Sequence, residues 1–360
     1  MRRPRRLAVI AAVAVVTPAL ASTGMGAAHG ENRSPYSPYA SREGDSWVGI
    51  DGQTHQSTSA KVVAATQGSD ELFAAWEFDD ACRAGEDFLR GLRTMSRVAK
   101  VIRKSGRRVI WTVGPNKSSV LTHLLDLTTL PHGSCALQGL ADQQSLLDNY
   151  PSRDYQPLRT KVASSKRQTY WRGDIHWSSV GASIWVKDLA RRLDPRLAKR
   201  QQWYSTVASY WGLLYQYSDV PTSETAPAVR PTKFVKVRRT RGIEPDAALP
   251  TNDVLRTGPI TDLAWRTKPA RATWPGRTLL IGDSFTLSAV ELLRPLFHHG
   301  RFLWFKAEAP EKIAKAVVRS DTVVLELVQV GVALWGAEAM PALLRAVRTA
   351  LADAPRRGSS

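Results

Sequence analysis

The chain has 360 residues, of which 43% are hydrophobic, so it is long enough to bury a core and too apolar for wholesale disorder. It contains 50 Lys and Arg residues against 32 Asp and Glu residues, and its formal net charge is +18 at pH 7. Such a charge favours acidic surfaces, either anionic lipid headgroups or acidic cell-envelope polymers, so peripheral membrane or cell-wall association is one expectation. A scattered basic surface that only keeps the protein soluble is the alternative. We expect no nucleic-acid partner, because zinc-finger spacing and a ribonucleoprotein aromatic motif are both missing from the sequence.

The N-terminus predicts an export signal. An apolar run over residues 7–16 is preceded by arginines and followed by a small-x-small site, Ala19-Leu20-Ala21. We therefore expect residues 1–21 to be a signal peptide, with an uncleaved anchor as the alternative, and an extracellular or cell-envelope location. Residues 22–45 are rich in Ser, Gly, Pro and Asn and predict a flexible linker.

The first predicted elements form half of an α/β repeat within one catalytic domain, 46–352. Residues 48–52 predict a strand and turn, residues 86–105 have the apolar spacing of an amphipathic helix, and residues 108–113 predict a buried strand. Asn116 and Lys117 follow at the carboxyl end of that strand, where ligands bind in parallel α/β sheets.

Only two cysteines are present, Cys82 and Cys135. In an oxidising compartment they predict one disulfide, with two free buried thiols as the alternative, because sequence separation does not give the distance between Cα atoms. We expect no metal and no cofactor, since there is no second Asp-x-His or His-x-His pattern.

The second half of the chain continues the α/β pattern after an irregular insertion. A short extended segment at 168–171 leads to Asp174, and a helix is predicted from Gly181 to near Pro195. Residues 200–275 are expected to be an insertion, or meandering strands that cover one side of the core. Strands then alternate with helices to a disordered tail at 353–360, with strands at 278–281, 302–305 and 322–328 and helices at 287–297, 311–318 and 337–351. The sequence thus predicts an α/β fold with a parallel sheet and helices on both faces.

Ser284 is the candidate nucleophile. It follows an apolar strand and a Gly-Asp turn and precedes a helix, so backbone N–H groups at the helix start could hold a developing oxyanion. The alternative is an ordinary serine that caps the helix.

Asp174 and His176 are the candidate acid and base. Two positions apart in an extended segment, they project to the same side, so the carboxylate could take one imidazole N–H and leave the other nitrogen to accept the serine proton. The alternatives are a solvent-exposed polar loop or half of a metal site.

Three further residues are candidates for the oxyanion or substrate. Asn116 could donate to the oxyanion, and Lys117 could meet an anionic group or lie in solvent. Trp177, next to the Asp-His pair, suits a sugar ring or an acyl pocket, with core packing as the alternative.

Four motifs in this order resemble the SGNH hydrolase-like domain of alginate O-acetyltransferase (AlgJ/AlgX-like) proteins. They are Gly49-x-Asp51-Gly52, Pro115-Asn116-Lys117, Tyr170-x-x-x-Asp174-x-His176-Trp177-x-x-x-Gly181-Ala182 and Leu280-Ile281-Gly282-Asp283-Ser284-Phe285. The resemblance implies a flavodoxin-like SGNH fold and exported O-acetylation of a polysaccharide through an acetyl-serine intermediate. It also implies Ser284 as nucleophile, His176 as base and Asp174 as orienting acid, with acetyl groups supplied by a membrane-bound O-acyltransferase.

Two departures bear on the substrate. Gly212-Leu213-Leu214 lacks the acid of the family's Gly-Asp-Leu, and Gln329-Val330 replaces its Glu-Arg pair after Glu326. We therefore expect a cell-envelope polysaccharide or exopolysaccharide other than alginate. The alternatives are a carbohydrate acetyl-esterase, which uses the same triad, and a non-catalytic basic envelope-binding protein.

Overall fold

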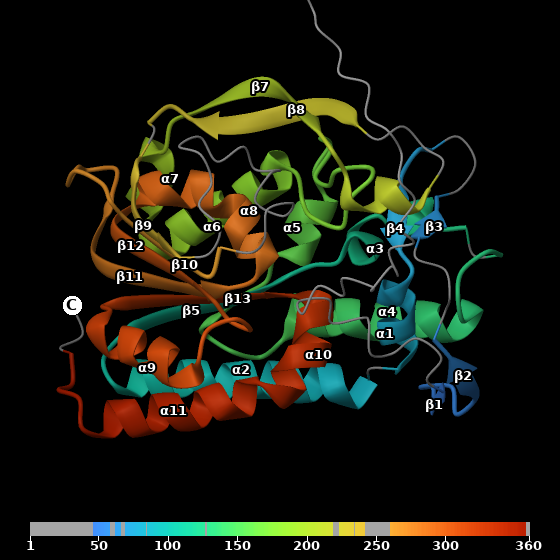
Figure 1. Cartoon of the computed structure of the whole chain (residues 1–360), viewed down its shortest axis with the longest axis horizontal. Coiled ribbons are helices and arrows are strands. Elements are labelled where there is room, and N and C mark those ends of the chain that lie inside the picture. Colours follow the sequence, from blue (N-terminus) through green and yellow to red (C-terminus); the bar gives the residue numbers. More distant parts are fainter. Residues whose placement is uncertain are drawn as a thin grey trace, which may run out of the picture. The chain divides into compact units, whose positions relative to one another are not determined.

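The computed structural model of the chain (Figure 1) describes residues 46–57, 62–65, 69–83, 85–126, 128–218, 223–233, 235–241 and 260–357. The predicted signal peptide, 1–21, and linker, 22–45, lie outside these residues.

A seven-stranded sheet forms the centre of the described residues, in the order β6-β5-β13-β11-β12-β10-β9. The first five strands in this order are parallel, and β10 and β9 continue the sheet in antiparallel fashion. The predicted parallel α/β sheet is therefore confirmed. The strands are β5 (Arg108–Gly114), β6 (Tyr155–Gln156), β9 (Val237–Arg241), β10 (Asp262–Arg266), β11 (Trp274–Gly282), β12 (Phe297–Trp304) and β13 (Thr322–Val328).

Helices cover both faces of this sheet (Figure 1). One face carries α2 (Gly85–Lys104), α9 (Pro310–Arg319), α10 (Gln329–Glu338) and α11 (Met340–Ala352), and the other carries α5 (Arg159–Ala163), α6 (Ser179–Leu193), α7 (Pro195–Arg200) and α8 (Ser284–Leu293). In α2, Phe88, Leu92 and Met95 recur at helical spacing and are fully buried against the sheet, which is why this segment forms an amphipathic helix. Gly106, at φ +81°, ends it in the left-handed conformation that glycine adopts without strain.

Smaller elements pack beside the sheet. These are the pairs β1 (Ser46–Val48) with β2 (Thr54–Gln56) and β3 (Val62–Ala64) with β4 (Leu72–Ala74), α1 (Trp76–Arg83), α3 (Lys117–Val120), η1 (Thr122–Leu124) and α4 (Gly133–Asn149). A disulfide joins Cys82 in α1 to Cys135 in α4, with their Cα atoms 5.0 Å apart. The predicted disulfide is confirmed, and the alternative of free thiols is wrong.

The described part of the inserted region, 200–275, contains strands, in agreement with the predicted alternative of meandering strands. β7 (Trp203–Tyr210) and β8 (Glu224–Pro231) pair as an antiparallel ribbon that contacts α6 and α8, with η2 (Leu213–Tyr217) between them. The same region also supplies β9 and β10 to the central sheet, and residues 242–259 lie outside the described part of the chain.

Several boundaries near the C-terminus differ from prediction. The helix predicted at 337–351 is α11, which begins at Met340 with Pro341 in its first turn, and it is preceded by a separate helix, α10, that the sequence did not predict. The helix predicted at 287–297 begins at Ser284 and gives way to η3 (Arg294–Leu296), which contains Pro295. Within the predicted tail, the backbone N–H of Arg357 donates to the Ser105 carbonyl (3.0 Å), so residues as far as 357 are held against the fold.

No single helix within the described ranges is long and apolar enough to span a membrane. The bent pair Gln329–Gly336 and Met340–Ala352, at 75° to each other, meets the requirement together by length and composition only.

Candidate active site

The carboxyl ends of the central parallel strands bring the candidate residues to one edge of the sheet. Val328 of β13 is in register with Gly114 of β5, and Ile281 of β11 is in register with Leu325 of β13. The residues that follow these strands, including Asn116 and Ser284, therefore emerge at the same edge, which is where α/β proteins bind ligands.

Asp174 and His176 lie in a tight loop closed by an antiparallel bridge between Tyr170 and Trp177. The Asp174 carboxylate accepts the backbone N–H of His176 (2.8 Å) and also bonds to its Nδ1 (2.6 Å). Because the Asp174 carboxylate accepts the backbone N–H two residues later, the pair is held by an Asx-type turn. The extended geometry predicted for this segment is therefore wrong.

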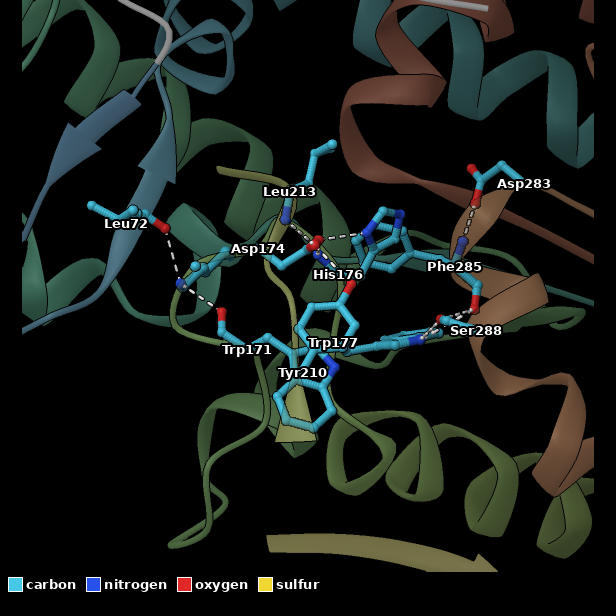
Figure 2. A network of polar contacts seen from close by, with 12 residues as sticks. Leu72, Trp171, Asp174, His176, Trp177, Tyr210, Leu213, Asp283, Phe285 and Ser288 are labelled. Atoms are coloured by element: carbon cyan, nitrogen blue, oxygen red, sulfur yellow. Dashed lines mark hydrogen bonds and ion pairs between the residues drawn. The ribbon is translucent and has the colours of Figure 1, made fainter. Parts of the chain in front are cut away.

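The other oxygen of Asp174 is held from the inserted region. The Tyr210 hydroxyl donates to Oδ2 (2.7 Å), and so does the backbone N–H of Leu213 (2.8 Å; Figure 2). Burial acts to raise the pKa of Asp174, but the imidazole and these donors outweigh it and the pKa lies below its ordinary value. Asp174 is thus an ionised, fully bonded carboxylate.

His176 is 3% exposed, and its Nε2 is buried without a hydrogen-bond partner among the described residues. Because Nδ1 bonds to Asp174, the neutral ring carries its proton there and Nε2 presents a lone pair. His176 therefore has the orientation that a general base needs, and its burial shows that the predicted alternative of a solvent-exposed loop is wrong. No hydrogen bond joins His176 to Ser284 in the described structure.

Ser284 is the first residue of α8, at the end of β11, and is half-buried. The helix cap is Asp283, whose side chain accepts the Phe285 N–H (2.8 Å). The alternative that Ser284 is itself the capping residue is therefore wrong. A serine at this position lies beside backbone N–H groups that have no partner inside the helix.

Two buried acids support this helix start. Asp283 also accepts the Val328 N–H (2.7 Å), and Glu326 accepts the hydroxyl of Thr286 (2.5 Å). Burial raises the pKa of Asp283 to about 6, and burial together with the charge of Asp283 raises the pKa of Glu326 well above its ordinary value. The charge on one of these carboxyl groups therefore disfavours ionisation of the other.

Trp177 connects the Asp-His loop to α8. It is 1% exposed, and its indole N–H donates to the Phe285 carbonyl (3.1 Å) and to Ser288 Oγ (2.8 Å; Figure 2). The ring of Phe285 lies between the two segments, with centroid distances of 5.2 Å to His176 and 5.0 Å to Trp177. Core packing thus describes Trp177, which fixes the spacing between the loop and the serine helix.

Lys117 is fully buried, so the alternative that it lies in solvent is wrong. Its Nζ donates to the carbonyls of Leu72 (2.9 Å) and Trp171 (2.8 Å) and pairs with Glu71 (2.5 Å). Burial lowers the pKa of the ammonium, and Glu71 opposes that effect. These partners give Lys117 the role of anchoring the loop that leads to Asp174.

Asn116 is buried between β5 and α10. Its Oδ1 accepts the Val330 N–H (3.2 Å), and its own backbone N–H donates to the Gln329 side chain (3.1 Å). The residue therefore ties two strand ends together, and its use as an oxyanion donor stays a prediction.

Sequence reasoning missed the supporting residues around the triad candidates. Asp283 had a visible signal, since an Asp before a helix is a preferred cap. Tyr210 and Leu213 had none, because they are distant in sequence and meet Asp174 only through the fold.

One further group, Asp51, His55, Cys82 and Cys135, has its potential metal ligands within 4.8 Å of one another, but the two sulfurs are bonded to each other and neither is a thiolate.

Comparisons with known proteins find solved structures with a similar fold. Two structures of Bacillus cereus PatB1, one with a sulfonyl adduct, match with TM-scores of 0.52 and 0.53 at 13% identity, each covering 75% of this chain and 96% and 95% of theirs. The O-acetyltransferase domain of Pseudomonas putida AlgJ matches with a TM-score of 0.46 at 15% identity, covering 76% of this chain and 92% of that domain. No curated protein matches the sequence.

The family model described as "SGNH hydrolase-like domain, acetyltransferase AlgX" matches residues 65–249. That range contains Asp174 and His176 and ends before Ser284. PatB1 supports the SGNH-like fold, and the family match extends over half of the sequence, so the chain belongs to the AlgX family of SGNH hydrolase-like acetyltransferases.

Proposed function

We propose that this acetyltransferase uses Ser284, His176 and Asp174 to transfer acetyl groups to hydroxyls of a cell-envelope polysaccharide or exopolysaccharide. The observation that carries the proposal is the hydrogen bonding of the two ring nitrogens of His176. Its Nδ1 bonds to a buried carboxylate while its Nε2 is buried and unpartnered, beside the helix that begins with Ser284. A missing contact between the base and the nucleophile is common before substrate binds.

In the first half-reaction, Ser284 Oγ bonds to the acetyl carbonyl carbon of the donor and passes its proton to His176 Nε2. The bond between that carbon and the donor oxygen then breaks, and the donor leaves as an alcohol after taking the proton from His176. Asp174 stabilises the imidazolium that forms in between. The product is acetyl-Ser284.

In the second half-reaction, a sugar hydroxyl gives its proton to His176 and bonds to the acetyl carbon, and Ser284 regains its proton as it leaves. Backbone N–H groups at the start of α8 are suited to hold the oxyanion in both steps. Transfer exceeds hydrolysis when the acceptor is positioned better than water.

Exposed aromatic and apolar side chains next to the site suit a sugar acceptor. Trp211 is 54% exposed, Leu213 38% and Tyr217 48%, and all three lie in the segment whose backbone and Tyr210 bond to Asp174. Aromatic faces of this kind can stack on the apolar faces of sugar rings.

The remaining parts of the proposal rest on the sequence and on family membership. The N-terminal signal pattern supports export, and we propose that a membrane-bound O-acyltransferase partner supplies the acetyl donor.

The test is the intact mass of the protein after mixing with p-nitrophenyl acetate, with and without candidate oligosaccharides. We expect an added acetyl group on Ser284 that a sugar removes faster than water does, leaving an acetylated sugar. Ser284→Ala and His176→Ala should each lower nitrophenol release by at least about 10³-fold. The matched controls are Ser145→Ala on α4 and His123→Ala on η1, both of which change exposed side chains.

An acetyl group lost to water whatever sugar is present would favour an esterase. Full activity in Ser284→Ala or His176→Ala would exclude the triad, and absence of any adduct in the wild type would favour a binding protein.

A further inference from the structure

A basic depression lies outside the candidate active site. It has a volume of about 910 Å³, and among the residues that the structure describes its lining contains seven Lys or Arg residues and neither Asp nor Glu. Four segments of the chain contribute these cations: the end of α7 (Lys199, Arg200), the turn after β8 (Lys233, Lys236), the end of β10 (Arg266, Lys268) and the turn before β11 (Arg271).

The cations of this depression are exposed. None of the seven forms an ion pair with another residue in the described ranges, whereas cations elsewhere on β9, β12 and α9 converge on Asp262. Like charges gathered in a concave surface raise the local potential, because the low-dielectric walls focus the field. Such a site attracts a ligand with several negative charges.

The depression is held in shape by bonds between its segments. The Arg200 guanidinium donates to the Arg271 carbonyl (2.9 Å), and the Gln201 amide donates to the Ala272 carbonyl (2.7 Å). These bonds fix the end of α7 against the turn before β11. A preformed site loses less conformational entropy when it binds a ligand than a mobile lysine cluster does.

The size of the depression and the spread of its cations over four segments distinguish between possible anionic ligands. The volume is at the upper end of that of pockets for drug-sized ligands, so a single phosphate would meet only a fraction of the cations. A bilayer surface would meet the rim but not the walls. An extended chain with repeated carboxylates or phosphates is the ligand that can contact all four segments.

The position also separates this depression from Ser284. It adjoins the start of β11, whereas Ser284 follows the end of that strand, and nine residues of strand span about 30 Å. A ligand bound in the depression therefore does not occupy the candidate catalytic site.

We propose that this depression is a second, non-catalytic binding site for an anionic polymer, which it holds by one segment of the chain. The inference does not depend on the chemistry proposed for Ser284, since a polymer can bind to protein that transfers no acetyl group.

The test measures binding of two defined polyanions, polygalacturonate and long-chain polyphosphate, to the Ser284→Ala protein at two salt concentrations. The test variant adds Lys233→Ala, Arg266→Ala and Arg271→Ala, one change in each of three segments. The control variant adds Lys100→Ala, Arg345→Ala and Arg348→Ala, which remove the same charges from exposed positions on α2 and α11.

We expect at least one polymer to bind, more weakly at higher salt, with an affinity that falls about tenfold or more in the test variant and little in the control. Equal losses in the two variants would overturn the site in favour of general charge attraction. Absence of binding to both polymers would overturn it as well. Binding only to vesicles of phosphatidylglycerol and phosphatidylcholine, lost in the test variant, would replace the polymer with a membrane surface.

Discussion

Asp174 is a buried carboxylate whose charge is balanced by donors from two segments of the chain, the His176 loop and the segment that contains Tyr210 and Leu213. Such a carboxylate fixes which nitrogen of the imidazole carries the proton. The lowered pKa of Asp174 means that it keeps its charge throughout the neutral range.

The Asp174→Asn variant is expected to lower the rate of acetyl-serine formation by about 10²–10⁴-fold while leaving the fold intact. The amide removes the charge that stabilises the imidazolium and can present an N–H to Nδ1, which favours the wrong tautomer. The measurement is the pre-steady-state burst of nitrophenol, with circular dichroism as the control for folding. A burst at the wild-type rate would remove Asp174 from the mechanism.

At the scale of elements, the β7–η2–β8 insertion contributes directly to the site. Gly212 makes this possible, because a Cβ there would lie 2.0 Å from the Gly173 carbonyl oxygen. The close contact places the segment from Trp211 to Tyr217, whose exposed side chains include Trp211, Leu213 and Tyr217, next to the loop that carries Asp174 and His176. An insertion that the sequence suggested only as a cover therefore completes the environment of the acid.

The Trp211→Ala variant is expected to raise KM for the sugar acceptor by about fivefold, since the loss of one stacking ring costs on the order of 1 kcal/mol. Formation of acetyl-Ser284 from p-nitrophenyl acetate should be nearly unchanged. The matched control is Tyr204→Ala, which removes another exposed ring near the start of β7, at the opposite end of the strand from Trp211. Equal KM values for the two variants would show that Trp211 does not contact the acceptor.

For the whole molecule, buried acids set how stability depends on pH. Burial raises the pKa of Glu77 from 4.5 to about 7 and that of Asp283 to about 6. Groups with a raised pKa stabilise the folded state below their unfolded pKa, and this contribution is lost as pH rises through the folded value. Asp174 and Asp262 have lowered pKa values, so their contribution is present above about pH 4 and is lost as pH falls.

In the wild type, the contribution of Glu77 to the unfolding free energy is lost as pH rises from 4.5 to about 7. The Glu77→Gln variant is expected to lack this loss, which is on the order of 3 kcal/mol. Glutamine keeps an acceptor for the Ser118 N–H, which Glu77 accepts at 3.1 Å, so the packing need not change. Urea unfolding at several pH values measures the effect. Parallel pH profiles for the variant and the wild type would contradict it.

The sequence alone predicted the class of fold and the edge of the sheet that holds the site. Short apolar runs alternate with amphipathic segments along the chain, and this pattern is set by residues close together in sequence. It therefore indicated a parallel sheet flanked by helices without knowledge of any tertiary contact. Ser284, Asn116 and Lys117 were placed at strand ends by the same local reasoning. Asp174 and His176 are two residues apart, and their contact is a local feature.

The partners that surround those residues follow from the packing of distant elements and could not be predicted from the sequence. Tyr210 and Leu213 reach Asp174, Lys117 is buried among carbonyls, and β9 and β10 join the central sheet through contacts between segments far apart in the chain. No periodicity encodes such contacts, because they depend on how whole elements pack. The reason is physical: local propensity selects a helix or a strand, whereas burial, charge pairing and hydrogen-bond satisfaction are settled only when distant elements meet.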